Sequence, residues 1–187
     1  MRTNRASAII RSTDWASAVL CAAVMLAAVS VSAATETYLQ ATIEASGRLR
    51  IVTAGGKVIL RRRLTTQVGF DMVAISPDGR VVGWVALYPN CCTSYPIPLT
   101  LVLYANGKTR MLTGSGLPIW RWRFEADGKQ VAFEQETVHG GLGTHYELRD
   151  VATGRLVEEY SPQKDDAGLA ASVREVPKWV AELNAKR

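Results

Sequence analysis

Ile75–Val85, which reads Ile-Ser-Pro-Asp-Gly-Arg-Val-Val-Gly-Trp-Val, returns in altered form at Phe124–Phe133, Phe-Glu-Ala-Asp-Gly-Lys-Gln-Val-Ala-Phe. Each copy has an apolar strand end, an Asp-Gly turn, a basic residue and a second apolar strand. Asp-Gly is a strong β-hairpin signal, because glycine adopts positive φ without steric strain. The turn glycines, Gly79 and Gly128, therefore define an internal repeat of about 50 residues.

Strand-length runs rich in Val, Ile, Leu, Tyr and Trp alternate with turn residues along the rest of the chain. A basic residue follows glycine at Gly47-Arg48, Gly56-Lys57, Gly79-Arg80, Gly107-Lys108, Gly128-Lys129 and Gly154-Arg155. We expect strands at 37–45, 48–53, 57–64, 69–75, 80–88, 98–105, 108–113, 119–125, 129–138, 144–150 and 155–160. The sequence therefore predicts an antiparallel, all-β domain over residues 35–162.

The period groups these strands into units of propeller-blade size. Residues 69–113 form one four-stranded unit, 119–160 a second, and 37–64 a shorter, degenerate one. A closed propeller has about four blades or more, so we expect two to three blade-like sheets in an open or incomplete propeller. Alternatively, a homo-oligomer completes a ring, or the strands form a compact β-sandwich.

The turn motifs resemble a known repeat. Ser76-Pro77-Asp78-Gly79-Arg80, followed by Val81-Val82-Gly83-Trp84, is similar to the TolB-type β-propeller repeat, and Glu147–Arg155 resembles the later part of such a blade. The likeness covers residues 69–160, although the second copy has Glu125-Ala126 where the repeat has Ser-Pro. The resemblance implies an envelope-associated interaction surface and no particular partner.

Residues 1–34 have the features of a signal peptide. A basic start is followed by an uncharged Ala/Val/Leu run from Trp15 to Val31 and then by small residues. We expect cleavage after Ala34, or else after Ala33, and therefore a periplasmic or secreted protein. The alternative is a retained anchor, in which case the protein contacts the membrane through the uncleaved signal.

The composition of the expected mature chain suits a single soluble domain. Loss of residues 1–34 removes three arginines and one aspartate, which lowers the formal net charge from +5 to +3. This mild charge favours solubility over nucleic-acid binding, so no nucleic-acid partner is expected. Cys91 and Cys92 are the two cysteines that remain, in a compartment where disulfides persist.

The tail, residues 163–187, differs in composition from the repeats. Its first part is polar and reads as a loop, whereas Val176–Leu183 predicts a short helix with Pro177 in its first turn. Trp179, Val180 and Leu183 would share one face of that helix. Because so short a helix is marginal alone, we expect it to dock on an exposed sheet.

The first candidate site is the Pro-rich connection 87–98, which contains Tyr88, Asn90, Cys91, Cys92 and Tyr95. Adjacent cysteines can join only through a strained ring, so such a vicinal disulfide is easily reduced. This pair predicts a rigid binding platform or a redox switch. The alternatives are that the pair fixes the loop, or that it exchanges disulfides between two chains.

The second candidate site is the Gly-rich connection that contains His139 and His145. With Cys91 or Cys92 these histidines could form a four-ligand set like that of zinc. Isolated loop histidines more often face solvent or form hydrogen bonds, so no metal site is predicted. The His-Gly-Gly segment is similar to the oxyanion motif of esterases, but the chain has no Gly-x-Ser-x-Gly turn for the nucleophile.

These observations favour a non-catalytic, exported binding module that recognises a protein or a cell-envelope component. We expect no cofactor. The alternative is a small periplasmic redox or metal-dependent enzyme that uses the Cys91-Cys92 connection.

Overall fold

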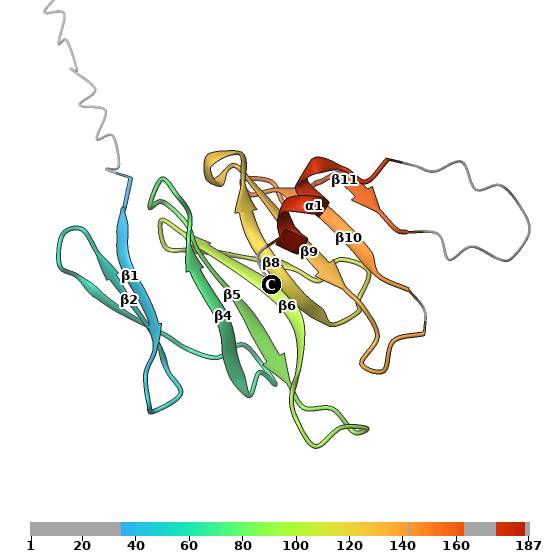
Figure 1. Ribbon diagram of the computed structural model, residues 1–187. Helices are drawn as coiled ribbons and strands as arrows, with labels where there is room; N and C mark the ends of the chain where they lie inside the picture. Colours follow the sequence, from blue (N-terminus) through green and yellow to red (C-terminus); the bar gives the residue numbers. More distant parts are fainter. Residues whose placement is uncertain (1–34, 142, 163–174, 186–187) are drawn as a thin grey trace, which may run out of the picture. The chain divides into compact units, whose positions relative to one another are not determined.

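The computed structural model describes residues 35–141, 143–162 and 175–185 (Figure 1). The expected signal peptide and most of the tail loop lie outside these residues, so cleavage and export stay predictions. Within the described ranges, no helix is both long enough and apolar enough to cross a membrane.

The strands of the described residues form three antiparallel sheets, each a meander in chain order. Sheet A contains β1 (Tyr38–Ile43), β2 (Leu49–Thr53) and β3 (Val58–Arg61). Sheet B contains β4 (Gly69–Ile75), β5 (Val82–Tyr88), β6 (Ile97–Ala105) and β7 (Lys108–Leu112). Sheet C contains β8 (Ile119–Glu125), β9 (Gln130–Gln135), β10 (His145–Asp150) and β11 (Leu156–Tyr160). The predicted all-β class is confirmed, with three open, blade-like sheets of which the first is the shortest.

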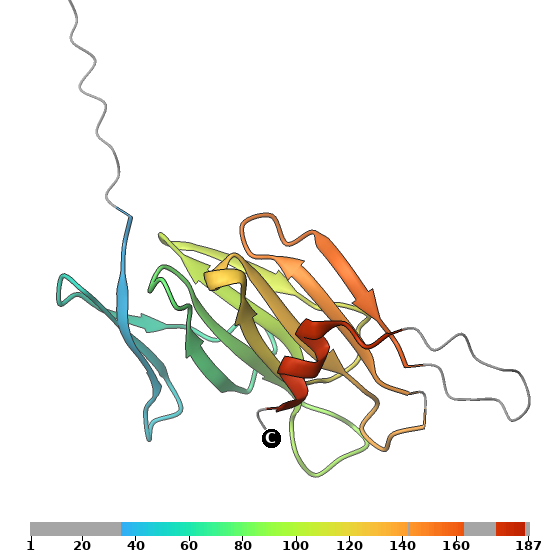
Figure 2. The same ribbon diagram turned by 45° about the horizontal axis from the view of Figure 1, so that its top comes forward.

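Sheet B is buried on both faces. This explains why the sequence of its strand β5 is almost continuously apolar. Successive side chains of a strand point to opposite faces. Val82 and Trp84 are fully or nearly fully buried in the core shared with sheet A, whereas Val85 is buried in the core shared with sheet C. The three sheets therefore pack face to face in the order A, B, C (Figure 2).

Gly83 leaves room for the contact between sheets B and C. A Cβ atom at this position would collide with the ring of Trp122 on β8. The indole Nε1 of Trp122 donates a hydrogen bond to the Met72 carbonyl, 2.9 Å away, at a bulge in β4. The ring also packs edge-on against Phe124, with 5.2 Å between centroids. The packing of sheet C on sheet B therefore requires glycine at position 83.

The helix α1 (Lys178–Ala185) covers the other face of sheet C. Val180 and Leu183 are 1% and 4% exposed, and they pack against Tyr146 of β10. This confirms the predicted C-terminal helix, which begins two residues later than expected. Pro177 precedes the helix, and its carbonyl accepts the amide hydrogen bonds of residues 180 and 181.

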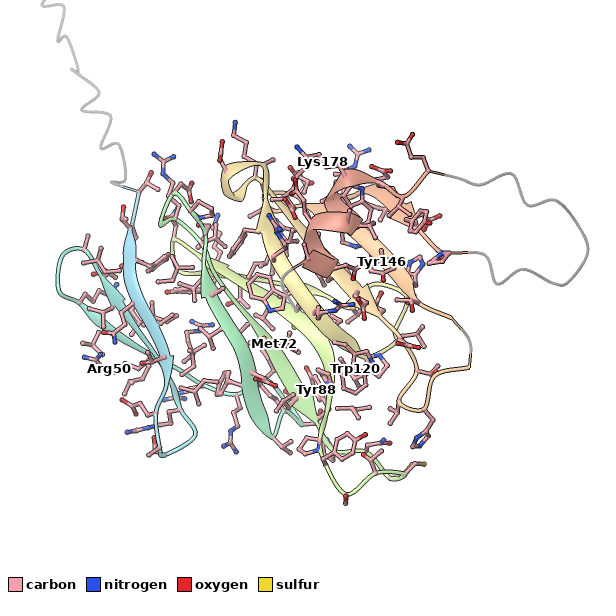
Figure 3. The ribbon with its side chains drawn as sticks, in the orientation of Figure 1. Arg50, Met72, Tyr88, Trp120, Tyr146 and Lys178 are labelled. Atoms are coloured by element: carbon pink, nitrogen blue, oxygen red, sulfur yellow. The ribbon has the colours of Figure 1, made fainter. Side chains whose placement is uncertain are left out.

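The outer face of sheet A is exposed to solvent. Arg50 of β2 points to this side, because its neighbours Leu49 and Ile51 are buried against sheet B (Figure 3). Leu39 is 67% exposed, and two residues of β3 on the same face, Val58 and Leu60, are each 47% exposed. The two outer sheets thus differ, since a helix covers the outer face of sheet C.

Candidate binding groove

The meander topology gives sheets B and C two distinct ends. The hairpin turns that follow β4, β6, β8 and β10 lie at one end, which we call the turn end. The connections β5–β6 and β9–β10 lie at the opposite end, which we call the loop end (Figure 1). All the site residues predicted from sequence are at the loop end, and both candidate connections extend from it.

In the β5–β6 connection, Asn90 closes the loop. Its side-chain nitrogen donates to Thr93 Oγ1 at 3.1 Å, and its side-chain oxygen accepts the Cys92 amide at 3.3 Å. Thr93 Oγ1 donates in turn to the Tyr95 carbonyl at 2.6 Å. Tyr88, labelled in Figure 3, is half-buried at the end of β5. Tyr95 is 48% exposed. The side-chain amide of Asn90 is thus used to shape this connection.

Cys91 and Cys92 are exposed thiols whose Sγ atoms lie 2.8 Å apart. The hydrogen bond with the Cys91 thiol raises the pKa of Cys92. A raised pKa keeps a thiol protonated at neutral pH and lowers its reactivity as a nucleophile. The geometry therefore gives Cys92 no activation, and the vicinal disulfide stays a prediction.

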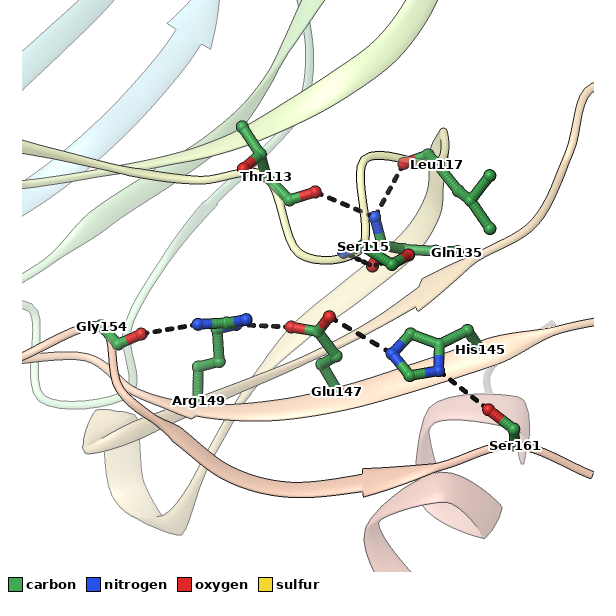
Figure 4. Close-up of polar contacts among 9 residues, drawn as sticks. All are labelled: Thr113, Ser115, Leu117, Gln135, His145, Glu147, Arg149, Gly154 and Ser161. Carbon is green, nitrogen blue, oxygen red and sulfur yellow. Dashed lines mark hydrogen bonds and ion pairs between the residues drawn. The ribbon is translucent and has the colours of Figure 1, made fainter.

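The two histidines of the β9–β10 connection have different surroundings. His139 is exposed in a turn, whereas His145 begins β10 and forms part of a polar ladder (Figure 4). His145 Nδ1 lies 2.8 Å from Ser161 Oγ, and Nε2 lies 3.3 Å from Glu147 Oε1. Arg149 Nε donates to Glu147 Oε2 at 2.5 Å. His145 is thus hydrogen-bonded, and the ladder joins β10 to the residue after β11.

A serine, an imidazole and a carboxylate in succession are also the groups of a hydrolytic triad. Here Glu147 is 3% exposed and is bound to Arg149, whose guanidinium also donates to the Gly154 carbonyl at 3.0 Å. A triad carboxylate acts by stabilising the imidazolium, and the Arg149 charge offsets that stabilisation at Glu147. The ladder links β10 to the end of β11 and braces these two strands.

The structure does not assemble the zinc set considered from the sequence. Across residues 35–141, 143–162 and 175–185, no three His, Cys, Asp or Glu side chains are placed to hold one metal ion. The loop end thus brings the candidate cysteines and histidines to the same end of the sheets, without joining them in a metal centre.

Gln135, at the end of β9, forms a second brace. It is fully buried, and its side-chain nitrogen donates to the carbonyls of Thr113 and Leu117 (Figure 4). Its side-chain oxygen accepts the Ser115 amide at 3.0 Å. The Gln135 amide therefore fixes the connection between sheets B and C.

The turn end contains a cavity of about 590 Å³ between sheets B and C, which we call the turn-end groove. Its charged lining consists of Arg80, Lys108, Arg110, Lys129, Asp78 and Asp150. Four cations and two carboxylates leave this lining with a net charge of +2. Below the charged side chains, Val81 and Leu103 are 7% and 3% exposed and supply apolar surface.

Both carboxylates of the groove are engaged by their own turns. Asp78 accepts hydrogen bonds from Ser76 Oγ at 2.6 Å and from the Arg80 amide at 3.1 Å. Desolvation raises the pKa of Asp78, but these hydrogen bonds and the Arg80 charge outweigh it and hold the pKa below its ordinary value. Asp150 accepts two hydrogen bonds from Thr153, which likewise lower its pKa. Both groups are therefore ionised at neutral pH.

The cations of the groove are less fully paired than its two carboxylates. Arg110 donates to the carbonyls of Ala152 and Thr153, at 2.5 and 2.8 Å, and its charge helps to lower the pKa of Asp150. Arg80 Nε lies 3.9 Å from Asp78 Oδ2. Among the described residues, no carboxylate is within ion-pair distance of Lys108 or Lys129. The groove is therefore a site of positive charge.

Sequence reasoning missed this site, although a signal for it was present. Arg80, Lys108 and Lys129 each follow a turn glycine directly, and the repeat places all three turns at the same end of the sheets. The sequence reading treated these residues only as markers of turns. Their common position depends on how sheets B and C pack, which no single hairpin determines.

The comparisons with known proteins assign no family to the chain. No protein-family model matches the sequence, and no curated protein matches it. Among solved structures, the chain is similar to Kuenenia stuttgartiensis hydrazine synthase, with 21% sequence identity and a TM-score of 0.44. The match covers 68% of this chain and 34% of that one, so this chain spans about a third of its length.

Proposed function

We propose that this protein is an exported, non-catalytic binding module of the cell envelope, and that it recognises a protein or envelope component through the turn-end groove. The observation that carries the proposal is the gathering of Arg80, Lys108 and Lys129 around one cavity of about 590 Å³. Exposed cations that converge on a cavity favour association with an anionic partner.

The proposal includes TolB-type repeats. The Ser-Pro-Asp-Gly turn at Ser76–Gly79 and the grouping of strands into blade-like sheets support this assignment. Such repeats imply an interaction surface, and the groove lies between the two sheets that carry the repeat.

A redox function at the loop end is the competing candidate. Two exposed thiols with sulfurs 2.8 Å apart favour it, because they could form a reversible disulfide. The raised pKa of Cys92 disfavours Cys92 as the attacking thiol of such a pair, and that role would then belong to Cys91.

Cell fractionation with three variants tests the proposal. The full chain is produced in a bacterium that exports it, and the fraction of exported protein that sediments with the envelope is measured. The groove variant is Lys108→Glu/Lys129→Glu. Its control, Arg48→Glu/Arg62→Glu, makes the same charge change at exposed positions beside the strands of sheet A, outside the groove. The third variant is Cys91→Ser/Cys92→Ser.

We expect the groove variant to lose envelope retention while the control and the cysteine variant keep it. The melting temperature of each variant checks its fold. Intact mass checks export, since a mature chain would begin near Thr35. Retention that depends on the cysteines and not on the lysines would replace the binding module with the redox candidate.

A further inference from the structure

We infer that the turn-end groove binds an acidic polypeptide segment in which carboxylate side chains flank an apolar residue. This inference rests on the proposed function of the groove, and it specifies the ligand. Two features of the lining support the inference. They are the partners that the four cations already have, and the apolar surface beside these cations.

The size of the groove fits a short segment of chain. Sites for small ligands enclose about 300–1,000 Å³, and the groove encloses about 590 Å³. Its uncharged lining includes Val81, Leu103, Ala105 and Val151, which come from both sheets. An apolar side chain placed against this surface would leave water, which favours binding. A ligand that is only an anion would leave that surface unused.

The arrangement of the cations favours two separated carboxylates over one compact phosphate. Phosphate is bound by the bidentate fork of arginine, by lysine as a point charge, and by amides at a helix N-terminus. The Arg110 fork is already used by the carbonyls of Ala152 and Thr153, and Arg80 lies beside Asp78. The ammonium groups of Lys108 and Lys129 remain, and a lysine acts as a compact point charge. Two such charges on separate turns suit two separate carboxylates.

The carboxylates of the groove add selectivity. Asp78 and Asp150 are ionised and held by their own turns, so they repel an anion that is placed near them. A ligand must therefore place its negative groups near Lys108 and Lys129 and its neutral part elsewhere. A segment with spaced acidic side chains can do so, whereas a compact polyanion cannot.

Fluorescence anisotropy of a labelled peptide tests the inference directly. The probe is fluorescein-labelled Ser-Glu-Glu-Leu-Glu-Glu-Leu-Ser, and the protein is the exported chain. We expect Lys108→Glu/Lys129→Glu to raise Kd by about tenfold or more. Arg48→Glu/Arg62→Glu should leave Kd within about twofold, because these exposed charges lie beside the strands of sheet A, outside the groove, and are screened. A peptide with Gln for Glu should lose binding, and one with Ser for Leu should bind more weakly.

Competition decides between peptide and other anions. Pyrophosphate and vesicles of phosphatidylglycerol are added to the complex of protein and peptide. We expect weak displacement by both. Efficient displacement by either one would overturn the polypeptide ligand in favour of a phosphate group or a lipid surface. An equal loss of affinity in the groove variant and its control would show unspecific attraction and would also overturn it.

The peptide experiment can fail without the binding module failing. If the probe does not bind but envelope retention still depends on Lys108 and Lys129, the ligand class is wrong and the module stands. If retention is indifferent to these lysines, the proposed function itself is wrong.

Discussion

The two Asp-Gly turns of the repeat have similar sequences, but they are built in different ways. In the first, side chains hold the turn: Ser76 Oγ donates to Asp78 and accepts the Val81 amide at 2.9 Å. Gly79, with φ +71°, is the residue of this turn that adopts positive φ. Local side-chain hydrogen bonds thus satisfy the backbone and leave most of it relaxed.

In the second turn, the backbone adopts an unfavourable conformation at two residues that are not glycine. Ala126 and Asp127 have φ values of 48° and 55°, and Gly128 follows at 88°. The residue before the turn, Glu125, makes no side-chain capping hydrogen bond. A left-handed conformation is unfavourable for alanine. The loss of Ser-Pro from the motif is therefore accompanied by a strained turn.

Besides adopting positive φ, the glycine of each turn lies close to a neighbouring segment. A Cβ at Gly79 would lie 2.9 Å from Thr37 Cγ2, just before sheet A, and a Cβ at Gly128 would lie 3.0 Å from Ser76 Cβ. Each turn thus contacts the preceding sheet or the segment that leads into it. For the second turn, this contact is with the first turn. The Ser-Pro part of the motif can therefore be replaced, whereas the glycine also serves the contact between sheets.

The largest expected effect is at this contact. Gly128→Ala should lower the free energy of unfolding by about 2–3 kcal/mol, because it adds strain at positive φ and a crowded contact with Ser76. Gly107→Ala is the control, since Gly107 has φ +78° and nothing within 4 Å of its added Cβ. It should lose about 1 kcal/mol. Urea unfolding measures the stability of both variants. Equal losses of unfolding free energy would mean that the two turns are not in close contact.

A smaller effect is expected from the side chain that distinguishes the turns. Ser76→Ala should lower the free energy of unfolding by about 1–2 kcal/mol, because the buried Val81 amide loses its hydrogen bond to Ser76 Oγ. Ser46→Ala, in an exposed turn of sheet A, should change it by less than about 0.5 kcal/mol. If chemical denaturation finds the two variants alike, the first turn does not depend on its side chains.

The smallest expected effect is a gain in stability. Ala126→Gly should raise the free energy of unfolding by about 0.5 kcal/mol, because glycine adopts φ 48° without strain. Ala54→Gly, at an exposed turn position without positive φ, should bring no gain. The midpoint of urea unfolding reports both changes. A loss at position 126 would indicate that the second turn is not strained.

The strands could be predicted because their signals are local. All eleven expected strands are found, and those at 69–75 and 119–125 have the predicted bounds. Asp-Gly and Asn-Gly turns with apolar runs on both sides define a hairpin without help from the rest of the chain. The repeat then grouped the hairpins into sheets, as in the pairing of β4 to β7.

The candidate site could not be predicted in the same way. The unusual residues of the sequence lie at the loop end, yet Asn90 closes its own loop and His145 braces β10. The groove is lined by ordinary lysines and arginines, and its lining comes from both sheets. Lys108 and Lys129 line one groove because sheets B and C pack together, and the packing of Trp122 on Gly83 is one contact between these sheets.

The helix α1 has a consequence for self-association. A stack of sheets with two bare ends could add copies head to tail and grow into a filament, because such contacts do not close. Here α1 covers the outer face of sheet C, while Leu39, Val58 and Leu60 remain exposed on sheet A. Copies that met through their outer sheet faces could therefore meet only at sheet A. The result would be a closed, two-fold pair that cannot propagate.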